Sequence, residues 1–343
     1  MDLQTRYDRQ LASWLIVCAA VILSMILLGG VTRLTGSGLS IVEWAPISGV
    51  LPPLNEQEWQ QTFDKYKQFP EYQKVNSGMD LPEFKRIFLY EYAHRLLGRL
   101  IGILFLVPFL FFYFSHRIKP GLTPKLMAMF VLGGLQGLLG WYMVKSGLVD
   151  NPSVSQYRLT AHLGTAVIIY GYIIWVAFSL LYPPESDLQK GQPTYRHFAV
   201  ALLGLVFLMI LSGGFVAGTD AGYAYPTFPL MGDSFIPPGI YQTEPFWLAA
   251  FEDITTIQFN HRIFAYLLIV VILSFAISTL KHGNIRPEAR TGIKLVLIML
   301  AVQVTLGIST LLLHMPVPLA AAHQGGAILL FTSVLFVCHR LGN

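Results

Sequence analysis

The chain has 343 residues, of which 54% are hydrophobic and only 12% are charged, and its mean hydropathy is +0.56. In soluble domains about a quarter of the residues are charged, so this composition excludes an ordinary soluble domain and predicts a polytopic membrane protein. The net charge of +4 is small, and the basic residues lie in loops and at helix ends, which gives no indication of nucleic-acid binding. The two cysteines, Cys18 and Cys338, lie in apolar runs, so we expect neither a disulfide framework nor a zinc site.

Apolar runs of about twenty residues predict eight membrane-spanning helices. They begin near Leu11, Ile87, Lys125, Arg158, His197, Ile257, Ile293 and Pro318. The connections after the second, fourth and sixth spans carry basic residues, among them Arg117, Lys190 and Arg286, whereas segment 218–256 has none. The long loop after the first span contains lysines, but long loops count little in the positive-inside rule. We therefore expect both termini in the cytoplasm and, because the N-terminus is too short and acidic for a transit peptide, a bacterial inner membrane.

The chain contains an internal repeat. Its matching positions are Gly29-Gly30 and Gly213-Gly214, His94-Arg95 and His261-Arg262, Gln136 and Gln303, Gly140 and Gly307, and His162 and His323. Each half has an even number of spans, so both halves run the same way through the membrane. The predicted fold is all-α, with eight transmembrane helices in two tandem four-helix bundles. They comprise residues 1–183 and 184–343 and are related by a pseudo-twofold axis along the membrane normal.

The stretch from Glu91 to Arg99 places ionisable side chains at the start of an apolar run. Such residues are costly in a bilayer, so a functional site is the default interpretation. On a helix Glu91 and His94 share a face, and both can point at one object held between helices. The alternative is a plain ion pair between Glu91 and Arg95, four residues apart, with His94 satisfied inside the bundle.

Four of the nine histidines lie a few residues inside the outer end of an even-numbered span. They form two pairs, His94 with His162 and His261 with His323. Inward histidines on facing helices are what bis-histidine haem requires, because two imidazoles approach the iron from opposite faces. Separations of 68 and 62 residues within the pairs are too long for a local zinc motif.

The halves differ three residues before the first histidine, where one half has Glu91 and the other Gln258. A carboxylate beside one haem can accept a proton or stabilise a cation, which an amide cannot do. Arg95 and Arg262 occur in both halves and are candidate contacts for haem propionates. Their alternative role is to reach the outer headgroups of the bilayer.

Taken together, these features resemble the haem A synthase family over essentially the whole chain. The resemblance rests on Gly29-Gly30-Val31-Thr32-Arg33-Leu34-Thr35, Ser37-Gly38-Leu39-Ser40, Glu91-x-x-His94-Arg95-x-x-Gly98-Arg99, His162, Asn260-His261-Arg262 and His323. It implies oxidation of the C8 methyl of haem O to the formyl group of haem A, for cytochrome oxidases of the aa3 type. The long loop 33–86 resembles the alphaproteobacterial and mitochondrial type, which has no cysteine pair in this loop.

The resemblance also implies a role for each site residue. His94 and His162 flank the substrate haem, His261 and His323 ligate a haem b cofactor, and Glu91 is the catalytic carboxylate. The haem O synthase (a farnesyltransferase) and cytochrome oxidase assembly factors are the implied protein partners, and the lipid bilayer is the surroundings. The four-histidine core alone equally permits a dihaem b-type electron-transfer protein, and a haem transporter is a third possibility. The presence of Glu91 in only one half favours an enzyme.

Overall fold

The computed structural model of the chain describes residues 3–43, 48–148, 152–183, 193–282 and 285–342. Throughout these ranges the regular secondary structure is helical, apart from an isolated β-bridge between Met231 and Ser234. The predicted all-α class is confirmed. Lys190, which contributed to the predicted orientation, lies outside the described residues, and the predicted border between the halves adjoins that same gap.

Among the described residues, eight helices are long and apolar enough to cross a membrane, as the sequence predicted. They are α1 (Leu3–Leu34), α4 (Leu81–Phe114), α5 (Thr123–Lys145), α6 (Gln156–Leu181), α7 (Pro193–Gly218), α9 (Ile254–His282), α10 (Pro287–Leu312) and α11 (Val317–Gly342). The protein is therefore a multi-pass membrane protein.

Helix α4 begins at Leu81, six residues before the start expected from hydropathy at Ile87. The reason is a capping box: the Asp80 side chain accepts a hydrogen bond from the Glu83 N–H at 2.9 Å, and the Glu83 side chain accepts one from the Asp80 N–H at 3.1 Å. At 1.5 Å per residue the helix is about 51 Å long, against about 30 Å for the apolar part of a bilayer. Its first turns therefore stand among the loops.

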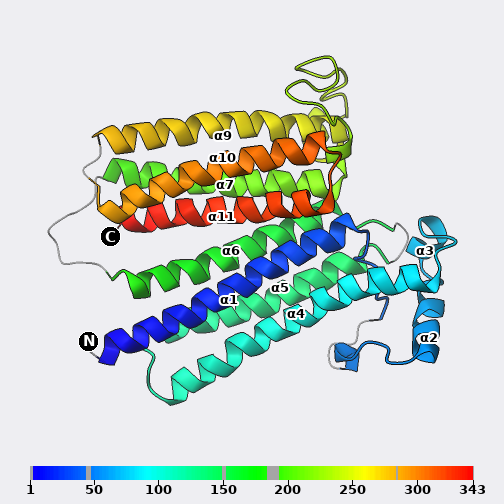
Figure 1. Cartoon of the computed structure of the whole chain (residues 1–343), viewed down its shortest axis with the longest axis horizontal. Coiled ribbons are helices and arrows are strands. Elements are labelled where there is room, and N and C mark those ends of the chain that lie inside the picture. Colours follow the sequence, from blue (N-terminus) through cyan, green and yellow to red (C-terminus); the bar gives the residue numbers. More distant parts are fainter. Residues whose placement is uncertain (1–2, 44–47, 149–151, 184–192, 283–284, 343) are drawn as a thin grey trace.

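The long helices form two groups of four (Figure 1). In the first group α1 packs on α4, α4 on α5, α5 on α6, and α6 on α1. In the second group α7 packs on α9, α9 on α10, α10 on α11, and α11 on α7. In both rings the helices that carry the histidines, α4 and α6 or α9 and α11, therefore stand opposite each other. This shared order supports the predicted pseudo-twofold axis, which stays a prediction.

The two groups meet where α1 and α6 pack against α7 and α11. Most buried apolar side chains belong to one cluster that runs through this contact, including Leu15 of α1 and Ile173 of α6. Hydrogen bonds also cross it: the hydroxyls of Tyr170 and Thr332 are 2.8 Å apart, and Gln324 Nε2 donates to the Ile26 carbonyl at 3.0 Å. The halves are thus joined by apolar packing and by polar contacts inside it.

Both termini lie at one end of the helices, and the long connections lie at the other, which we call the loop end (Figure 1). The first connection contains η1 (Ser48–Val50), α2 (Glu56–Tyr66) and α3 (Pro70–Lys74), and the second contains η2 (Ala221–Tyr223), η3 (Phe246–Leu248) and α8 (Ala249–Glu252). A separate apolar cluster holds the first connection on α4 through Phe63, Tyr66, Phe84 and Phe88. An ion pair of 2.8 Å between Arg33, in the last turn of α1, and Asp220 links the first helix to the second connection.

Candidate functional site

The four predicted histidines lie on the two pairs of opposed helices. His94 is on α4 and His162 on α6, while His261 is on α9 and His323 on α11. All four side chains are half-buried. Within each pair the two histidines lie on helices that stand opposite each other in the same group of four. The structure therefore places each predicted histidine pair on two opposed helices of one four-helix group.

Each of these histidines packs on a glycine of the neighbouring helix. A Cβ atom built on Gly29 would lie 3.1 Å from His94 Nε2, and one on Gly140 would lie 2.9 Å from His162 Cε1. In the second half, the corresponding distances are 3.5 Å from Gly213 to His261 Cε1 and 2.8 Å from Gly307 to His323 Cε1. Real Cβ atoms almost never approach within 3.0 Å, so a side chain at Gly140 or Gly307 would displace the imidazole. The repeated glycines are thus part of the histidine sites.

The ring nitrogens of these histidines are poorly supplied with protein partners. The Nδ1 atoms of His162 and His323 are buried and have no hydrogen-bond partner in the described part of the chain. Buried polar atoms are normally paired, so each of these nitrogens has room for a partner such as a water, an ion or a ligand. Two imidazoles from opposite helices, with glycines behind their rings, fit an iron porphyrin between them.

A zinc site would need a different donor set. Structural and catalytic zinc sites use three or four protein ligands. No group of three or more histidine, cysteine, aspartate or glutamate side chains that could hold a metal lies together within the described ranges. Two histidines in each described pair therefore suit a metal that already has other ligands, such as an iron bound by the four nitrogens of a porphyrin.

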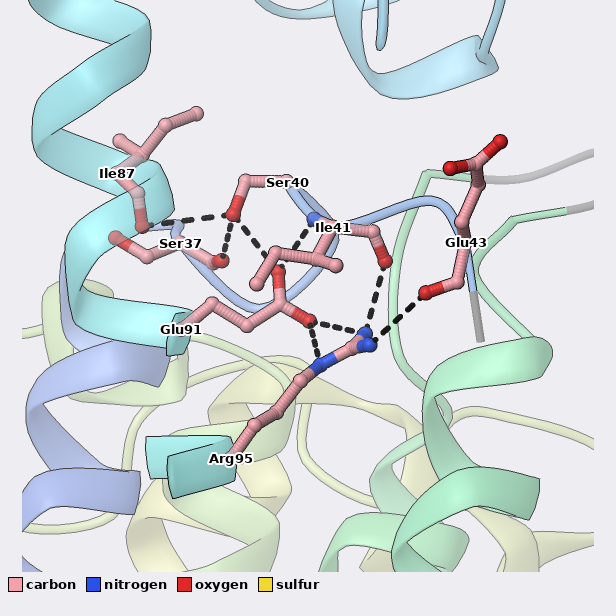
Figure 2. A network of polar contacts seen from close by, with 7 residues as sticks. All are labelled: Ser37, Ser40, Ile41, Glu43, Ile87, Glu91 and Arg95. Carbon is pink, nitrogen blue, oxygen red and sulfur yellow. Dashed lines mark hydrogen bonds and ion pairs between the residues drawn. The ribbon is translucent and has the colours of Figure 1, made fainter. Parts of the chain in front are cut away.

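Glu91 is buried at the loop end, and its carboxylate is fully hydrogen-bonded (Figure 2). Its Oε1 accepts from Arg95 Nε at 3.0 Å and from Arg95 Nη2 at 2.6 Å. Its Oε2 accepts from the Ser40 hydroxyl at 2.7 Å and from the Ile41 N–H at 2.8 Å. The carboxylate thus joins α4 to the segment 37–43 that follows α1.

The ion pair considered in the sequence analysis is present, but it is not a surface pair. The side chains of Glu91 and Arg95 are only 4% and 16% exposed. Among the described residues, the hydrogen-bond partners of the carboxylate are Ser40, Ile41 and Arg95, and His94 is not one of them. Glu91 and His94 are neighbours on α4 whose side chains make separate contacts.

The equivalent position in the second half holds Gln258, with the opposite hydrogen-bond polarity. Gln258 Nε2 donates to the carbonyls of Gly222 at 3.3 Å and Tyr225 at 3.2 Å. Arg262 Nη2 also donates to the Tyr225 carbonyl, at 2.7 Å, and its Nη1 donates to the Leu230 carbonyl at 3.2 Å. The amide therefore donates to its loop, whereas the carboxylate of Glu91 accepts from its own.

Both arginines hold loop backbone in place. Arg95 Nη2 donates to the Ile41 carbonyl at 2.8 Å, as Arg262 does to Tyr225. The Arg262 Nε is buried and has no hydrogen-bond partner in the described structure, so one donor remains for another acceptor. Propionate contact by Arg95 and Arg262 stays a prediction, and the structure adds a loop-anchoring role to both.

Two polar residues near these sites were not predicted from the sequence. Glu71 is buried in the first connection, where its Oε2 accepts a hydrogen bond from the Tyr66 hydroxyl at 3.0 Å. Burial raises the pKa of Glu71 to about 7 and also raises the pKa of Tyr66. The aromatic residues around Glu71 in the sequence were the available signal that this loop has a packed interior.

The second missed residue is Ser212, whose hydroxyl lies 3.0 Å from His261 Nδ1. It directly precedes Gly213-Gly214, and the repeat places Leu28 at the equivalent position of the first half. That difference between the halves was visible in the sequence, but its proximity to His261 was not.

Comparisons with known proteins agree with this geometry. A family model described as cytochrome oxidase assembly protein (COX15-CtaA) matches residues 12–335. The protein named Heme A synthase of Nitrosospira multiformis is 52% identical over 341 residues, covering 99% of this chain and 96% of that protein. Proteins of the same name are 51% identical in Nitrosomonas eutropha (99% and 96% covered) and 48% identical in Paramagnetospirillum magneticum (100% and 96% covered). With a family model that matches residues 12–335 and relatives that are similar over nearly the whole chain, this chain belongs to the COX15-CtaA family of cytochrome oxidase assembly proteins.

Proposed function

We propose that this protein is a haem A synthase, which oxidises the C8 methyl group of haem O to the formyl group of haem A. The observation that carries the proposal is the set of four histidines on opposed helices, each packed on a glycine. The relatives named Heme A synthase, at 48–52% identity over nearly their whole length, support it. Haem A is the cofactor of aa3-type cytochrome oxidases, which agrees with a family of oxidase assembly proteins.

The two histidine pairs have separate tasks in this proposal. His94 and His162, in the half comprising residues 1–183, flank the substrate haem O. His261 and His323, in the half comprising residues 184–343, hold a haem b cofactor, which supplies one-electron redox chemistry when bound. Two neutral imidazoles on opposite faces suit a low-spin haem that transfers electrons without releasing a ligand. The hydrogen bond between Ser212 and His261 supports the assignment of the permanent cofactor to the second pair.

Glu91 is the catalytic carboxylate in this proposal, because oxidation of a methyl group releases protons. The carboxylate is held one turn before His94 on α4 and is kept in place by Arg95, Ser40 and Ile41. A fixed carboxylate at the edge of a site can accept a proton and pass it on. Arg95 and Arg262, which bind loop backbone at the loop end, are the proposed contacts of the haem propionates.

The proposed orientation in the membrane rests on basic residues at the end of the helices where both termini lie. Arg117, Lys125 and Arg286 all lie in or next to the short connections at that end. By the positive-inside rule that end faces the cytoplasm of a bacterial inner membrane. The haem sites then lie toward the outer face. The haem O synthase and oxidase assembly factors are the proposed partners, since one supplies the substrate and the others receive the product.

Haem extraction tests the function directly. Expression in a host that makes haem O but no haem A, followed by chromatography of extracted haems, should give haem A only with the functional chain. The double variant His94→Ala, His162→Ala is the control, and it should keep the second haem while forming no haem A. A preparation that holds two b-type haems but never yields haem A would instead identify a dihaem electron-transfer protein.

A further inference from the structure

One hydrogen bond separates His261 from His94 and His162, the two histidines of the first half. Its Nδ1 lies 3.0 Å from the Ser212 hydroxyl of α7. No ring-nitrogen hydrogen bond of His94 or His162 is found among the described residues. Leu28, which occupies the position of Ser212 in the first half, has no group that could make such a bond. The second histidine pair therefore has a polar partner that the first pair lacks.

The chemistry of iron binding fixes the direction of this bond. A neutral imidazole carries one proton, and the nitrogen that binds a metal must be the other one. With Ser212 on Nδ1, the free lone pair is on Nε2, so Nδ1–H donates and the serine oxygen accepts. A histidine that donates its second N–H in this way has a fixed tautomer and ring orientation and is a stronger electron donor to the metal.

Stronger donation has a predictable effect on a redox cofactor. A more basic ligand stabilises ferric over ferrous iron, and hydrogen bonding to the axial ligand is one of the means by which a protein sets a haem potential. The bond also lies beside Gly213, which places the ring of His261 against α7. Packing and hydrogen bonding thus hold the same ring from one helix.

We propose that Ser212 is a positioning residue of the second histidine pair. By accepting a hydrogen bond from His261 Nδ1–H, it presents Nε2 to the iron and lowers the midpoint potential of the haem held there. The proposal rests on the proposed function, because it takes His261 and His323 to be ligands of haem b. It adds a built-in electronic difference between the cofactor haem and the substrate haem.

Potentiometric titration of the purified, haem-loaded full-length protein tests this. In Ser212→Ala the ferric-to-ferrous equilibrium of haem b should shift about tenfold toward ferrous, an upward change in midpoint potential of about 59 mV for one electron. Ser212→Thr keeps the hydroxyl and should restore the wild-type potential. Ser24→Ala is the matched control, because it removes a helix serine whose hydroxyl binds only the Ala20 carbonyl of its own helix, and it should change nothing.

The outcomes separate this proposal from the function on which it rests. An unshifted potential in Ser212→Ala, or an equal shift in Ser212→Thr, would overturn the role of the hydroxyl and leave the function intact. Loss of haem b from Ser212→Ala but not from Ser212→Thr would support it, whereas loss from both would point to packing and overturn it. Haem b that persists unchanged in His261→Ala would refute the ligand assignment and this inference together.

Discussion

The replacement Glu91→Gln tests the role of the Glu91 carboxylate, because it keeps the size of the side chain and removes its charge. The wild-type carboxylate accepts four hydrogen bonds, two from Arg95, one from Ser40 and one from Ile41. A glutamine has one accepting oxygen and one donating amide group. If the oxygen stays on Arg95, the amide faces the Ile41 N–H, and two donors then oppose each other. Ser40 can rotate its hydroxyl, but a backbone N–H cannot adapt.

The magnitude follows from the burial of the pair. The Glu91 and Arg95 side chains are 4% and 16% exposed, so Arg95 would keep a largely buried charge without its counter-ion. Removing one partner of a buried ion pair costs about 3–5 kcal/mol. We expect this loss of stability to loosen segment 37–43 and the rest of the connection between α1 and α4. The histidine pairs do not use this carboxylate, so haem content should persist.

Activity should respond more strongly than stability. If Glu91 accepts a proton in the reaction, conversion of haem O to haem A in Glu91→Gln should fall by about two orders of magnitude or more. The measurement is the ratio of haem O, hydroxylated haem and haem A extracted from cells, normalised to the protein present. Limited proteolysis of the connection between α1 and α4 measures the loosening in the same samples.

Ser40→Ala is the matched control for loop anchoring. It removes the 2.7 Å bond to the same carboxylate oxygen but leaves the carboxylate itself. We expect increased proteolysis and less than a tenfold loss of haem A formation. Wild-type haem A ratios in Glu91→Gln would refute the catalytic role. Equal losses of activity in both variants would show that Glu91 acts only by anchoring the loop.

Three other predictions concern the histidine sites and the buried carboxyl of the loop. His261→Ala and His323→Ala should each remove the low-spin haem b spectrum from purified protein, while the exposed His197→Ala should not; a spectrum unaltered by both changes would exclude the assignment. Gly307→Ala should reduce haem b content, because its Cβ would lie 2.8 Å from His323 Cε1, whereas Gly204→Ala meets nothing within 4 Å and should keep full content. Burial raises the pKa of Glu71 from 4.5 to about 7, so the folded state binds its proton more tightly than the unfolded state. Its stabilising contribution is complete below about pH 4.5 and is lost as pH rises to about 7. Glu71→Gln should therefore be more stable than wild type at pH 8, by on the order of 3 kcal/mol, and equal near pH 4, as measured by thermal unfolding across that range.

The sequence predicted the span number and the histidine pairs because both depend on patterns that survive without coordinates. Apolar runs report burial in lipid, and matching positions in a repeat report matching places in space. The exact helix starts were missed because hydropathy ignores capping: the start of α4 depends on Asp80 and Glu83, which are polar. The site glycines were recognised as part of the repeat. Their contacts with the histidines became visible only in the packing of neighbouring helices.

The surroundings of Glu91 were the least predictable part of the site. Its spacing to Arg95 predicted an ion pair, and exposed pairs of that kind contribute only a few tenths of a kcal/mol. The burial of the pair depends on segment 37–43 folding over it, through Ser40 and the Ile41 N–H. A helical spacing rule contains no information about a loop fifty residues away. The same limit hid Glu71 and Ser212, whose partners lie on other turns or other helices.

The difference between the halves extends beyond the helices to the loops that cover them. Ile41 offers an N–H to Glu91, whereas Gly222 and Tyr225 offer carbonyl oxygens to Gln258. A carboxylate in place of Gln258 would face two acceptors and would lack the donors that hold Glu91. Each loop has therefore been matched to its residue, and the presence of a carboxylate in one half is a property of loop and helix together. The two helix bundles thus carry the same histidine pairs but differ in the polar groups at their loop ends.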